Sequence, residues 1–277
     1  MAKDDLDENP PNGLEEAYKD IDFLESDNGR ALRMLAEYME PNTRFSEMGV
    51  SDTIVVFGSA RIPSPEQAQD SLKKANAGDG DLAMAQRDVK NARYYTAART
   101  LSRRLTEWAR NVDGPQARFV ICSGGGPGIM EAANRGAADA GGINIGLNIR
   151  LPHEQHENPY VTDELSFKFH YFFMRKFWFV YLAKAVIIFP GGFGTMDELF
   201  EVLTLDQTGK LAHPLPIVLF GSEYWNDVVN LDAMVTAGTI DANDLALCLR
   251  TDSIDEAYDF LVRELSERAL PCPGGNL

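Results

Sequence analysis

Two glycine-rich loops are the segments of this sequence best suited to hold an anionic ligand. The first reads Ser-Gly-Gly-Gly-Pro-Gly over Ser123–Gly128, and the second reads Pro-Gly-Gly-Phe-Gly-Thr over Pro190–Thr195. Each follows an apolar run and precedes a stretch with the apolar spacing of a helix. Glycine lets the backbone approach a ligand closely, and the free amides at a helix start favour phosphate. A pair of such loops favours ligand binding over two structural turns.

Neither loop completes a common nucleotide-binding fingerprint. A Gly-x-Gly-x-x-Gly motif would need glycine at position 129, 131 or 197, where Ile129, Glu131 and Asp197 stand. The chain also contains no Gly-x-x-x-x-Gly-Lys-Ser/Thr sequence. The dinucleotide-binding and P-loop classes are therefore disfavoured.

Glu198 admits a structural and a chemical interpretation. Thr195 and Glu198 have the Thr-x-x-Glu spacing of a capping box, which by itself would explain both residues. The preceding stretch, Tyr171–Leu182, is apolar on nearly every face and carries only the charges of Arg175 and Lys176. Such a helix is normally buried, and a buried guanidinium needs an anionic partner. A carboxylate or a bound phosphate would serve, so both interpretations stay open.

Alternating strand and helix patterns predict the scaffold that positions these residues. The predicted strands are Thr53–Phe57, Phe119–Cys122, Ile143–Ile149, Ala185–Phe189, Pro216–Phe220 and Ala246–Arg250. The predicted helices are Arg93–Trp108, Ile129–Ala140, Phe172–Lys184, Met196–Thr208, Tyr224–Ala237 and Ile254–Glu267. This order predicts an α/β fold with a doubly wound parallel sheet and helices on both faces. Ligands of such sheets bind beyond the carboxyl ends of the strands.

The chain divides into three parts by composition. Residues 1–50 form an acidic N-terminal tail, expected to be disordered over residues 1–13, and a helical extension of one or two helices over residues 14–40. Residues 51–270 form the α/β domain, in which the polar segment 63–90 is a loop or a short helix. Residues 271–277 form a C-terminal tail.

Charge and cysteine content exclude several classes of protein. The formal net charge of −16 argues against binding to nucleic acid or to an anionic membrane surface. Three cysteines without a Cys-x-x-Cys pair predict neither a disulfide framework nor a zinc site, and the four histidines show no metal-ligand spacing. No secretory signal is visible, and charges interrupt the apolar stretch 172–188, which speaks against a membrane span. We expect a cytoplasmic globular protein without a bound metal.

The residues above match the LOG family of cytokinin riboside 5′-monophosphate phosphoribohydrolases, which the sequence resembles from about Thr53 to Phe220. Many members were long labelled lysine decarboxylases. The match rests on Arg175-Lys176, on their spacing to Glu198, and on Pro-Gly-Gly-x-Gly-Thr-x-x-Glu over Pro190–Glu198. The stretch Ser123–Ala137 is a second anchor. The N-terminal 50 residues and the segment 63–90 depart from the short plant-type members and are more similar to a longer bacterial subgroup.

The resemblance implies a Rossmann-like domain that is dimeric or built from dimers. It also implies hydrolysis of the N-glycosidic bond of a nucleoside 5′-monophosphate, without a cofactor, to free base and ribose 5-phosphate. The family's catalytic residues fall on Arg175 and Glu198. Its substrate contacts fall on Glu154, Lys176, Gly191, Gly192, Phe193, Gly194, Thr195, Met196, Asp197 and Thr204. Gly124, Gly125 and Gly126 of the other glycine-rich loop complete the predicted site.

Two alternatives compete with a hydrolase. A non-catalytic carrier of the same fold would bind a nucleotide or a phosphorylated cofactor without cleaving it, although binding alone does not require both Arg175 and Glu198. A pyridoxal-phosphate decarboxylase would need a Schiff-base lysine, for which Lys176 and Lys184 are candidates.

Overall fold

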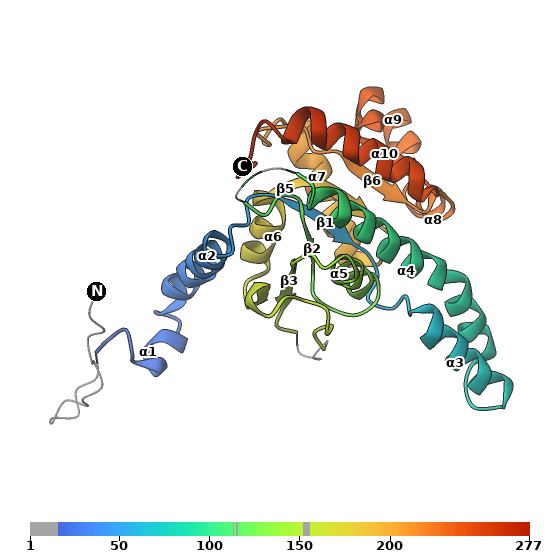
Figure 1. Ribbon diagram of the computed structural model, residues 1–277, viewed down its shortest axis with the longest axis horizontal. Coiled ribbons are helices and arrows are strands. Elements are labelled where there is room, and N and C mark those ends of the chain that lie inside the picture. Colours follow the sequence, from blue (N-terminus) through green and yellow to red (C-terminus); the bar gives the residue numbers. More distant parts are fainter. Residues whose placement is uncertain (1–15, 113, 115, 152–155) are drawn as a thin grey trace.

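A seven-stranded, wholly parallel sheet forms the centre of the computed structural model, which describes residues 16–277 except 113, 115 and 152–155 (Figure 1). The strand order is β4-β3-β2-β1-β5-β6-β7, and neighbouring strands pair in parallel throughout. In chain order the strands are β1 (Thr53–Phe57), β2 (Val120–Ser123), β3 (Asn144–Ile149), β4 (Ser166–Phe169), β5 (Ala183–Ile188), β6 (Ile217–Phe220) and β7 (Cys248–Thr251). The order reverses at β1 and β5, as in a doubly wound Rossmann-like sheet.

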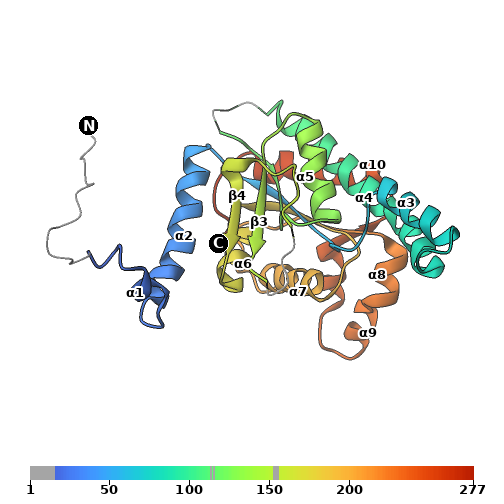
Figure 2. The ribbon, with the colours of Figure 1, turned by 90° about the horizontal axis from the view of Figure 1, so that it is seen from below.

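Helices cover both faces of this sheet, as the sequence predicts (Figure 2). They are α1 (Ile21–Glu25), α2 (Arg30–Glu47), α3 (Pro65–Asn76), α4 (Leu82–Ala109), α5 (Ile129–Asp139), α6 (Phe172–Tyr181), α7 (Phe193–Gln207), α8 (Ser222–Val228), α9 (Leu231–Thr236) and α10 (Ile254–Glu264). Alternate side chains of β1 point to opposite faces. Ile54 and Val56 join the core under α4, α5 and α10, whereas Val55 and Phe57 join the core under α2, α6 and α7.

The segment 63–90 is helical over most of its length. Ser64 caps α3 in a capping box with Gln67, and Asp81 caps α4, which extends eleven residues before the predicted start at Arg93. The Ser-Pro-x-Gln pattern at residues 64–67 signals the start of α3 in the sequence. The first half of α4 shows no clear apolar stripe, because much of it lies on the surface beside α3.

Three other predicted elements differ from the structure. The edge strand β4 was not predicted, because its four residues, Ser-Phe-Lys-Phe, give too short an alternation. The helix predicted over Phe172–Lys184 ends at Tyr181, and Lys184 lies in β5. The helix predicted over Tyr224–Ala237 is two helices, because Asn230 caps a new start at Leu231.

The N-terminal extension consists of α1 and α2, which project from the body of the molecule beside α6 (Figure 1). Phe45 of α2 packs against Trp178 of α6 with ring centroids 5.3 Å apart. The predicted tail over residues 1–13 lies outside the described residues. Within the described part of the chain, no helix is both long and apolar enough to cross a membrane.

Both glycine-rich loops meet the loop that follows β1 at the carboxyl edge of the sheet. The Ser59 amide donates to the Pro190 carbonyl at 2.9 Å, and the Ile129 amide donates to the Ser59 carbonyl at 3.1 Å. Gly128 has a φ of 71°, and a Cβ there would lie 2.4 Å from the Ser59 carbonyl oxygen. The first loop can therefore cross β1 only with glycine at this position.

Candidate active site

A cavity of about 720 Å³ opens at the carboxyl edge of the sheet, where the strand order reverses. It lies between the ends of β1, β2, β3 and β5 and the helices α6, α7 and α8. Its lining includes Ser59, Gly124, Arg175, Gly192, Thr195 and Glu198. The fold therefore brings the second loop, one glycine of the first loop and the predicted catalytic pair to one space.

The second glycine-rich loop is the start of α7. This helix begins at Phe193, with Gly192 as its N-cap, and no side chain caps it. Thr195 lies inside the first turn, so the capping box predicted for Thr195 and Glu198 is wrong. The amides of Phe193, Gly194 and Thr195 have no intrahelical acceptor, as at any helix start. These three residues line the cavity, so the free amides and the positive end of the helix dipole favour an anion there.

The glycines of this loop serve different purposes. A Cβ at Gly191 would lie 2.0 Å from the Thr195 hydroxyl oxygen, so packing excludes a side chain there. A Cβ at Gly192 or Gly194 would meet nothing within 4 Å. Local packing does not require these two glycines, and the open space in front of them is available to a ligand.

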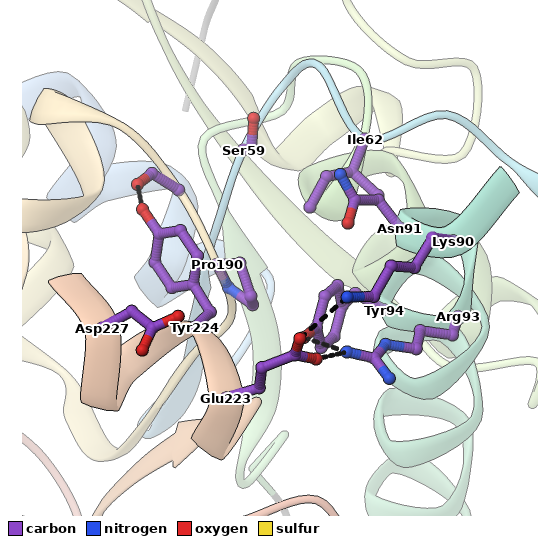
Figure 3. A pocket seen from close by; sticks show the side chains of 11 residues that line it. Ser59, Ile62, Lys90, Asn91, Arg93, Tyr94, Pro190, Glu223, Tyr224 and Asp227 are labelled. Carbon is purple, nitrogen blue, oxygen red and sulfur yellow. Dashed lines mark hydrogen bonds and ion pairs between the residues drawn. The ribbon is translucent and has the colours of Figure 1, made fainter. Parts of the chain in front are cut away.

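Tyr224 holds the loop from α8. Its hydroxyl donates to the Gly191 carbonyl at 2.5 Å, and its ring lines the cavity. On the other side of Tyr224 lies a smaller pocket of about 300 Å³, bounded by α4 and α8 (Figure 3). There Glu223 pairs with Lys90 and Arg93, each at 2.8 Å, so both cations of this pocket share one carboxylate.

Arg175 and Glu198 face each other inside the main cavity. Arg175 Nη2 lies 3.8 Å from Glu198 Oε1, and both side chains are buried. Within the described residues, Arg175 Nε and Glu198 Oε2 have no hydrogen-bond partner. Two buried polar atoms that lack a partner at one cavity are free to bind a ligand. The anionic partner expected for Arg175 is therefore the Glu198 carboxylate, at a distance that leaves both groups incompletely satisfied.

Burial dominates the electrostatics of this pair. It raises the pKa of Glu198 from the ordinary 4.5 to about 7, even though Lys176 and Arg175 draw it down. Burial also lowers the pKa of the Arg175 guanidinium. A carboxyl whose pKa lies near neutrality, in a cavity beside a cation, has the properties of a catalytic acid or base.

The first glycine-rich loop is held from behind by buried side chains. Gly124 lines the cavity. The carbonyl of Gly125 accepts from the Asn158 amide at 2.9 Å, and the carbonyl of Gly126 accepts from Asn158 Nδ2 at 3.0 Å. Ser123 Oγ accepts from the Gly125 amide at 3.0 Å. Of the three predicted glycines, only Gly124 is at the cavity wall.

Three predicted substrate contacts lie elsewhere, and a fourth is not described. Lys176, Asp197 and Thr204 line a shallow depression on the outer side of α7. There Lys176 Nζ pairs with Asp197 at 2.8 Å and with Glu201 at 2.9 Å. Phe193 and Met196 line both spaces. Glu154 lies outside the described residues.

The structure adds cavity residues that the sequence analysis did not single out. Ser59 and Arg61 follow β1, and Asn148 is near the end of β3. The sequence contained a signal for Ser59 and Arg61, because the β-branched run of β1 also ends in Gly58-Ser59 at the ligand edge. Asn148 carries no such signal, since an isolated asparagine near a strand end is common.

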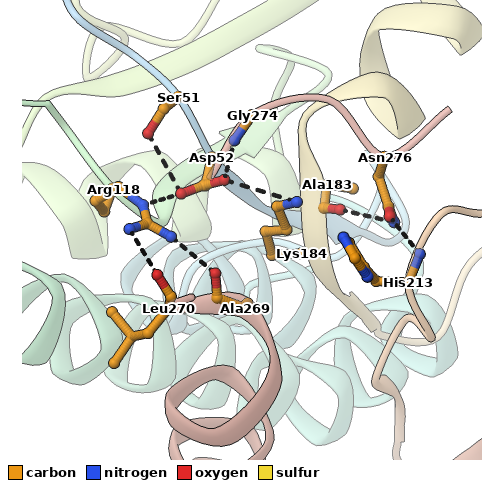
Figure 4. A network of polar contacts seen from close by, with 10 residues as sticks. All are labelled: Ser51, Asp52, Arg118, Ala183, Lys184, His213, Ala269, Leu270, Gly274 and Asn276. Carbon is orange, nitrogen blue, oxygen red and sulfur yellow. Dashed lines mark hydrogen bonds and ion pairs between the residues drawn. The ribbon is translucent and has the colours of Figure 1, made fainter. Parts of the chain in front are cut away.

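The two lysines considered for a Schiff base lie outside the main cavity. Lys176 is in the outer depression, and Lys184 is at the start of β5, on the opposite edge of the sheet (Figure 4). The side chain of Lys184 is 2% exposed, with Nζ 3.9 Å from an oxygen of Asp52. Asp52 also pairs with Arg118 and accepts from the Gly274 amide. This network joins the C-terminal tail to the sheet.

Fold and site together define an α/β protein whose cavity is lined by a helix start and by a buried carboxylate. A family model described as "Possible lysine decarboxylase" matches residues 130–261. A cytokinin riboside 5′-monophosphate phosphoribohydrolase of Arabidopsis thaliana is 26% identical over 211 residues, which cover 75% of this chain and 90% of that protein. Another, from Oryza sativa subsp. japonica, is 30% identical over 153 residues, which cover 54% of this chain and 59% of that protein. The chain is therefore similar to the LOG family of phosphoribohydrolases.

Solved structures with a similar arrangement are more distant. The crystal structure of TM1055 has a TM-score of 0.47 and 19% identity, over 76% of this chain and 99% of that one. A Moco carrier protein from Chlamydomonas reinhardtii has a TM-score of 0.42 and 16% identity, over 78% of this chain and 98% of that one.

Proposed function

We propose that this protein hydrolyses the N-glycosidic bond of a nucleoside 5′-monophosphate and releases free base and ribose 5-phosphate. One observation carries the proposal: the buried Glu198, with an oxygen that has no partner among the described residues, opens onto the same cavity as the free amides of α7. A binding protein needs the amides but has no use for a carboxylate that is costly to ionise.

The amides of Phe193, Gly194 and Thr195 bind the 5′-phosphate. This anchors the sugar and fixes the reacting bond, which lowers the entropic part of the barrier. Glu198 comes one helical turn after Thr195, on the same side of α7. A phosphate held at the helix start therefore leaves the ribose within reach of the carboxylate.

Cleavage builds positive charge on the sugar as the bond to the base breaks. The Glu198 carboxylate stabilises this oxocarbenium-like state and accepts a proton from the attacking water, whose oxygen bonds to C1′. The base leaves with the electron pair of the broken bond and takes up a proton. Arg175 orients the carboxylate or the substrate from the opposite wall.

The cavity suits a purine nucleotide in size and lining. Its volume of about 720 Å³ lies within the range of small-molecule sites. Met130, Ile149, Phe172 and Val228 give it an apolar wall for the base. We infer that AMP, N6-prenylated AMP or both are the substrates, because this wall accepts a planar base with or without an apolar substituent.

Base release from a panel of nucleoside 5′-monophosphates, followed by chromatography, tests the proposal. We expect stoichiometric free base and ribose 5-phosphate from at least one purine nucleotide, and no release from the matching nucleosides without phosphate. A protein that binds these nucleotides but releases base from none of them is a carrier.

We also infer that the protein acts as a dimer or as an assembly of dimers. Phe172, Phe173 and Phe200 are exposed on α6 and α7, and Phe193 is 96% exposed between the cavity and the outer depression. Exposed aromatic side chains concentrated on neighbouring helices support a protein interface at this face.

A further inference from the structure

The N-terminal extension contacts α6, the helix that carries Arg175, and the contact is at the start of that helix. Glu37 of α2 accepts two backbone hydrogen bonds from the residues that lead into α6. The His170 amide donates to Glu37 Oε1 at 2.6 Å, and the Tyr171 amide donates to Glu37 Oε2 at 3.2 Å. A carboxylate at this place also compensates the positive end of the α6 dipole, for which α6 has no acidic residue in its own first turn.

The same residue also holds the middle of α6. The indole Nε1 of Trp178 donates to the Glu37 backbone carbonyl at 3.0 Å, and the Tyr38 ring stacks on Trp178 with centroids 5.7 Å apart. Arg175 lies between these two attachment points, four residues after Tyr171 and three before Trp178. Both ends of the stretch that carries Arg175, about two helical turns, are therefore fixed from α2.

The position of the Arg175 guanidinium depends on this helix. Its Nε has no partner among the described residues, and its contact with Glu198 is long, at 3.8 Å. The rings of Phe172 and Phe179, which lie 5.3 and 5.4 Å from the guanidinium carbon, belong to α6 itself. Within the described part of the chain, the guanidinium is held by this long contact and by two rings of its own helix, so a shift of α6 moves it directly.

We propose that Glu37 is a positioning residue, which fixes the start of α6 from the N-terminal extension and thereby holds Arg175 against Glu198. This inference rests on the proposed hydrolase function. It gives the extension a role in the reaction, because the extension supplies the acceptor that the start of α6 lacks in its own first turn.

The test uses the full chain and compares Glu37→Ala, Glu37→Gln and Glu47→Ala. Glu47 is exposed at the end of the same helix, so its variant controls for a lost charge on α2. We expect E37A to lower kcat by about 10- to 100-fold, the cost of a misplacement of roughly 1 Å. KM should change little, because α7 holds the phosphate. E37Q keeps one acceptor oxygen and should fall between E37A and the wild type, while E47A should match the wild type.

Two further readouts separate positioning from simple loosening of the fold. Arg175 draws down the pKa of Glu198, so a displaced Arg175 lets that pKa rise and moves the acid limb of the kcat profile to higher pH. Hydrogen exchange should quicken across residues 170–181 in E37A and remain unchanged in E47A. If E37A does not fold, the test uses E37Q alone. We then expect a smaller fall in kcat, a smaller shift of the acid limb and a smaller increase in exchange than those given for E37A.

The inference is overturned if α6 exchanges faster while kcat and the acid limb stay at wild-type values, because Glu37 is then structural only. Unchanged exchange in E37A or in folded E37Q also overturns it. If the wild-type protein releases base from no nucleotide, the proposed function fails instead. The exchange experiment still decides whether Glu37 holds α6.

Discussion

Glu198 is under two opposing demands. Water access would stabilise its ionised form, yet catalysis of bond cleavage needs a carboxylate in a cavity where its field is strong. The pKa of about 7 reflects that conflict, because the unpaired Oε2 and the 3.8 Å gap to Arg175 leave the charge only partly compensated. The stability of the fold must therefore depend on whether this group carries a proton.

The sign of that dependence follows from the two pKa values of the same group. The folded value, about 7, is above the ordinary 4.5, so the native state binds more protons than the unfolded state between these values. The wild type loses stability as pH rises through this window and stays less stable above it. At about 1.4 kcal/mol per unit, the ionised carboxylate costs roughly 3 kcal/mol.

Glu198→Gln, which mimics the protonated carboxyl, should therefore be more stable than the wild type at pH 8. The gain should approach roughly 3 kcal/mol and disappear below about pH 4.5. Urea denaturation at pH 4.5 and pH 8 measures it, with Glu47→Gln as a control of equal charge change on an exposed site. A variant less stable than the wild type at pH 8 would mean that Glu198 stabilises the fold and is not held at a cost.

At the scale of elements, the start of α7 decides whether the cavity can hold phosphate. The sequence shows glycine at Gly191, Gly192 and Gly194 but does not show which of them packing requires. The structure separates them, since only Gly191 has no room for a side chain. A glycine in the first turn of a helix that packing does not require points to close approach of a ligand.

Replacing Gly194 with Ala should therefore separate stability from binding. Alanine removes the entropic penalty of glycine, which is worth up to about 1 kcal/mol in a helix. Its methyl group projects into open space where the phosphate must approach the amides. We expect an unchanged or higher melting temperature and an AMP affinity reduced by at least tenfold in calorimetry.

Gly191→Ala is the contrasting variant, because its methyl group collides with Thr195 and should lower the melting temperature. If Gly194→Ala binds AMP as well as the wild type does, the helix start is not the phosphate site.

How far the elements were predictable depends on the length of each local signal. The strands β1 and β5 are long β-branched runs, and the alternation with helices predicted the parallel sheet correctly. β4 has four residues and was missed. The start of α7 was misplaced by three residues because Thr195 and Glu198 satisfy the spacing of a capping box, and spacing alone cannot tell an N-cap from a third helical residue.

Only the part of the candidate site that has a local sequence signal was predictable. The charge of Arg175 on an otherwise apolar helix predicted an anionic partner and left open whether it is a carboxylate or a phosphate. The resemblance to the LOG family paired Arg175 with Glu198, and the structure places them together. The segregation of Lys176 and Asp197 to the outer side of α7 depends on helix orientation, which the sequence does not encode locally. The bonds from Glu37 to residues 170 and 171 join segments 133 and 134 residues apart, so no local pattern could reveal them.

At the scale of the whole molecule, the proposed function requires an acidic chain to admit an anion. The net charge of −16 opposes the approach of a nucleotide, and the amides of α7 with Arg175 provide a local region of opposite sign. The remaining exposed face of α6 and α7 carries the phenylalanines that support a dimer.

Light scattering after gel filtration tests the assembly. We expect twice the mass of one chain, or a multiple of it, for the wild type. Phe173→Asp should shift the protein toward the monomer, because it places a charge on the proposed interface. Leu82→Asp, at an exposed apolar position on the distant α4, should leave the mass unchanged. A wild-type protein that elutes as a monomer at micromolar concentration contradicts the inferred dimer.

The central claim is that Glu198 catalyses hydrolysis of the N-glycosidic bond of a nucleotide whose phosphate binds at the start of α7. The most direct measurement is single-turnover release of base from AMP, and from its N6-prenylated form, by the wild type and by Glu198→Gln, with nucleotide affinity measured on the same samples. We predict that the variant binds as tightly as the wild type and releases base at least 100-fold more slowly, within the cost of removing a catalytic base. Equal release by both proteins would contradict the role of Glu198, and binding without release by the wild type would contradict hydrolysis itself.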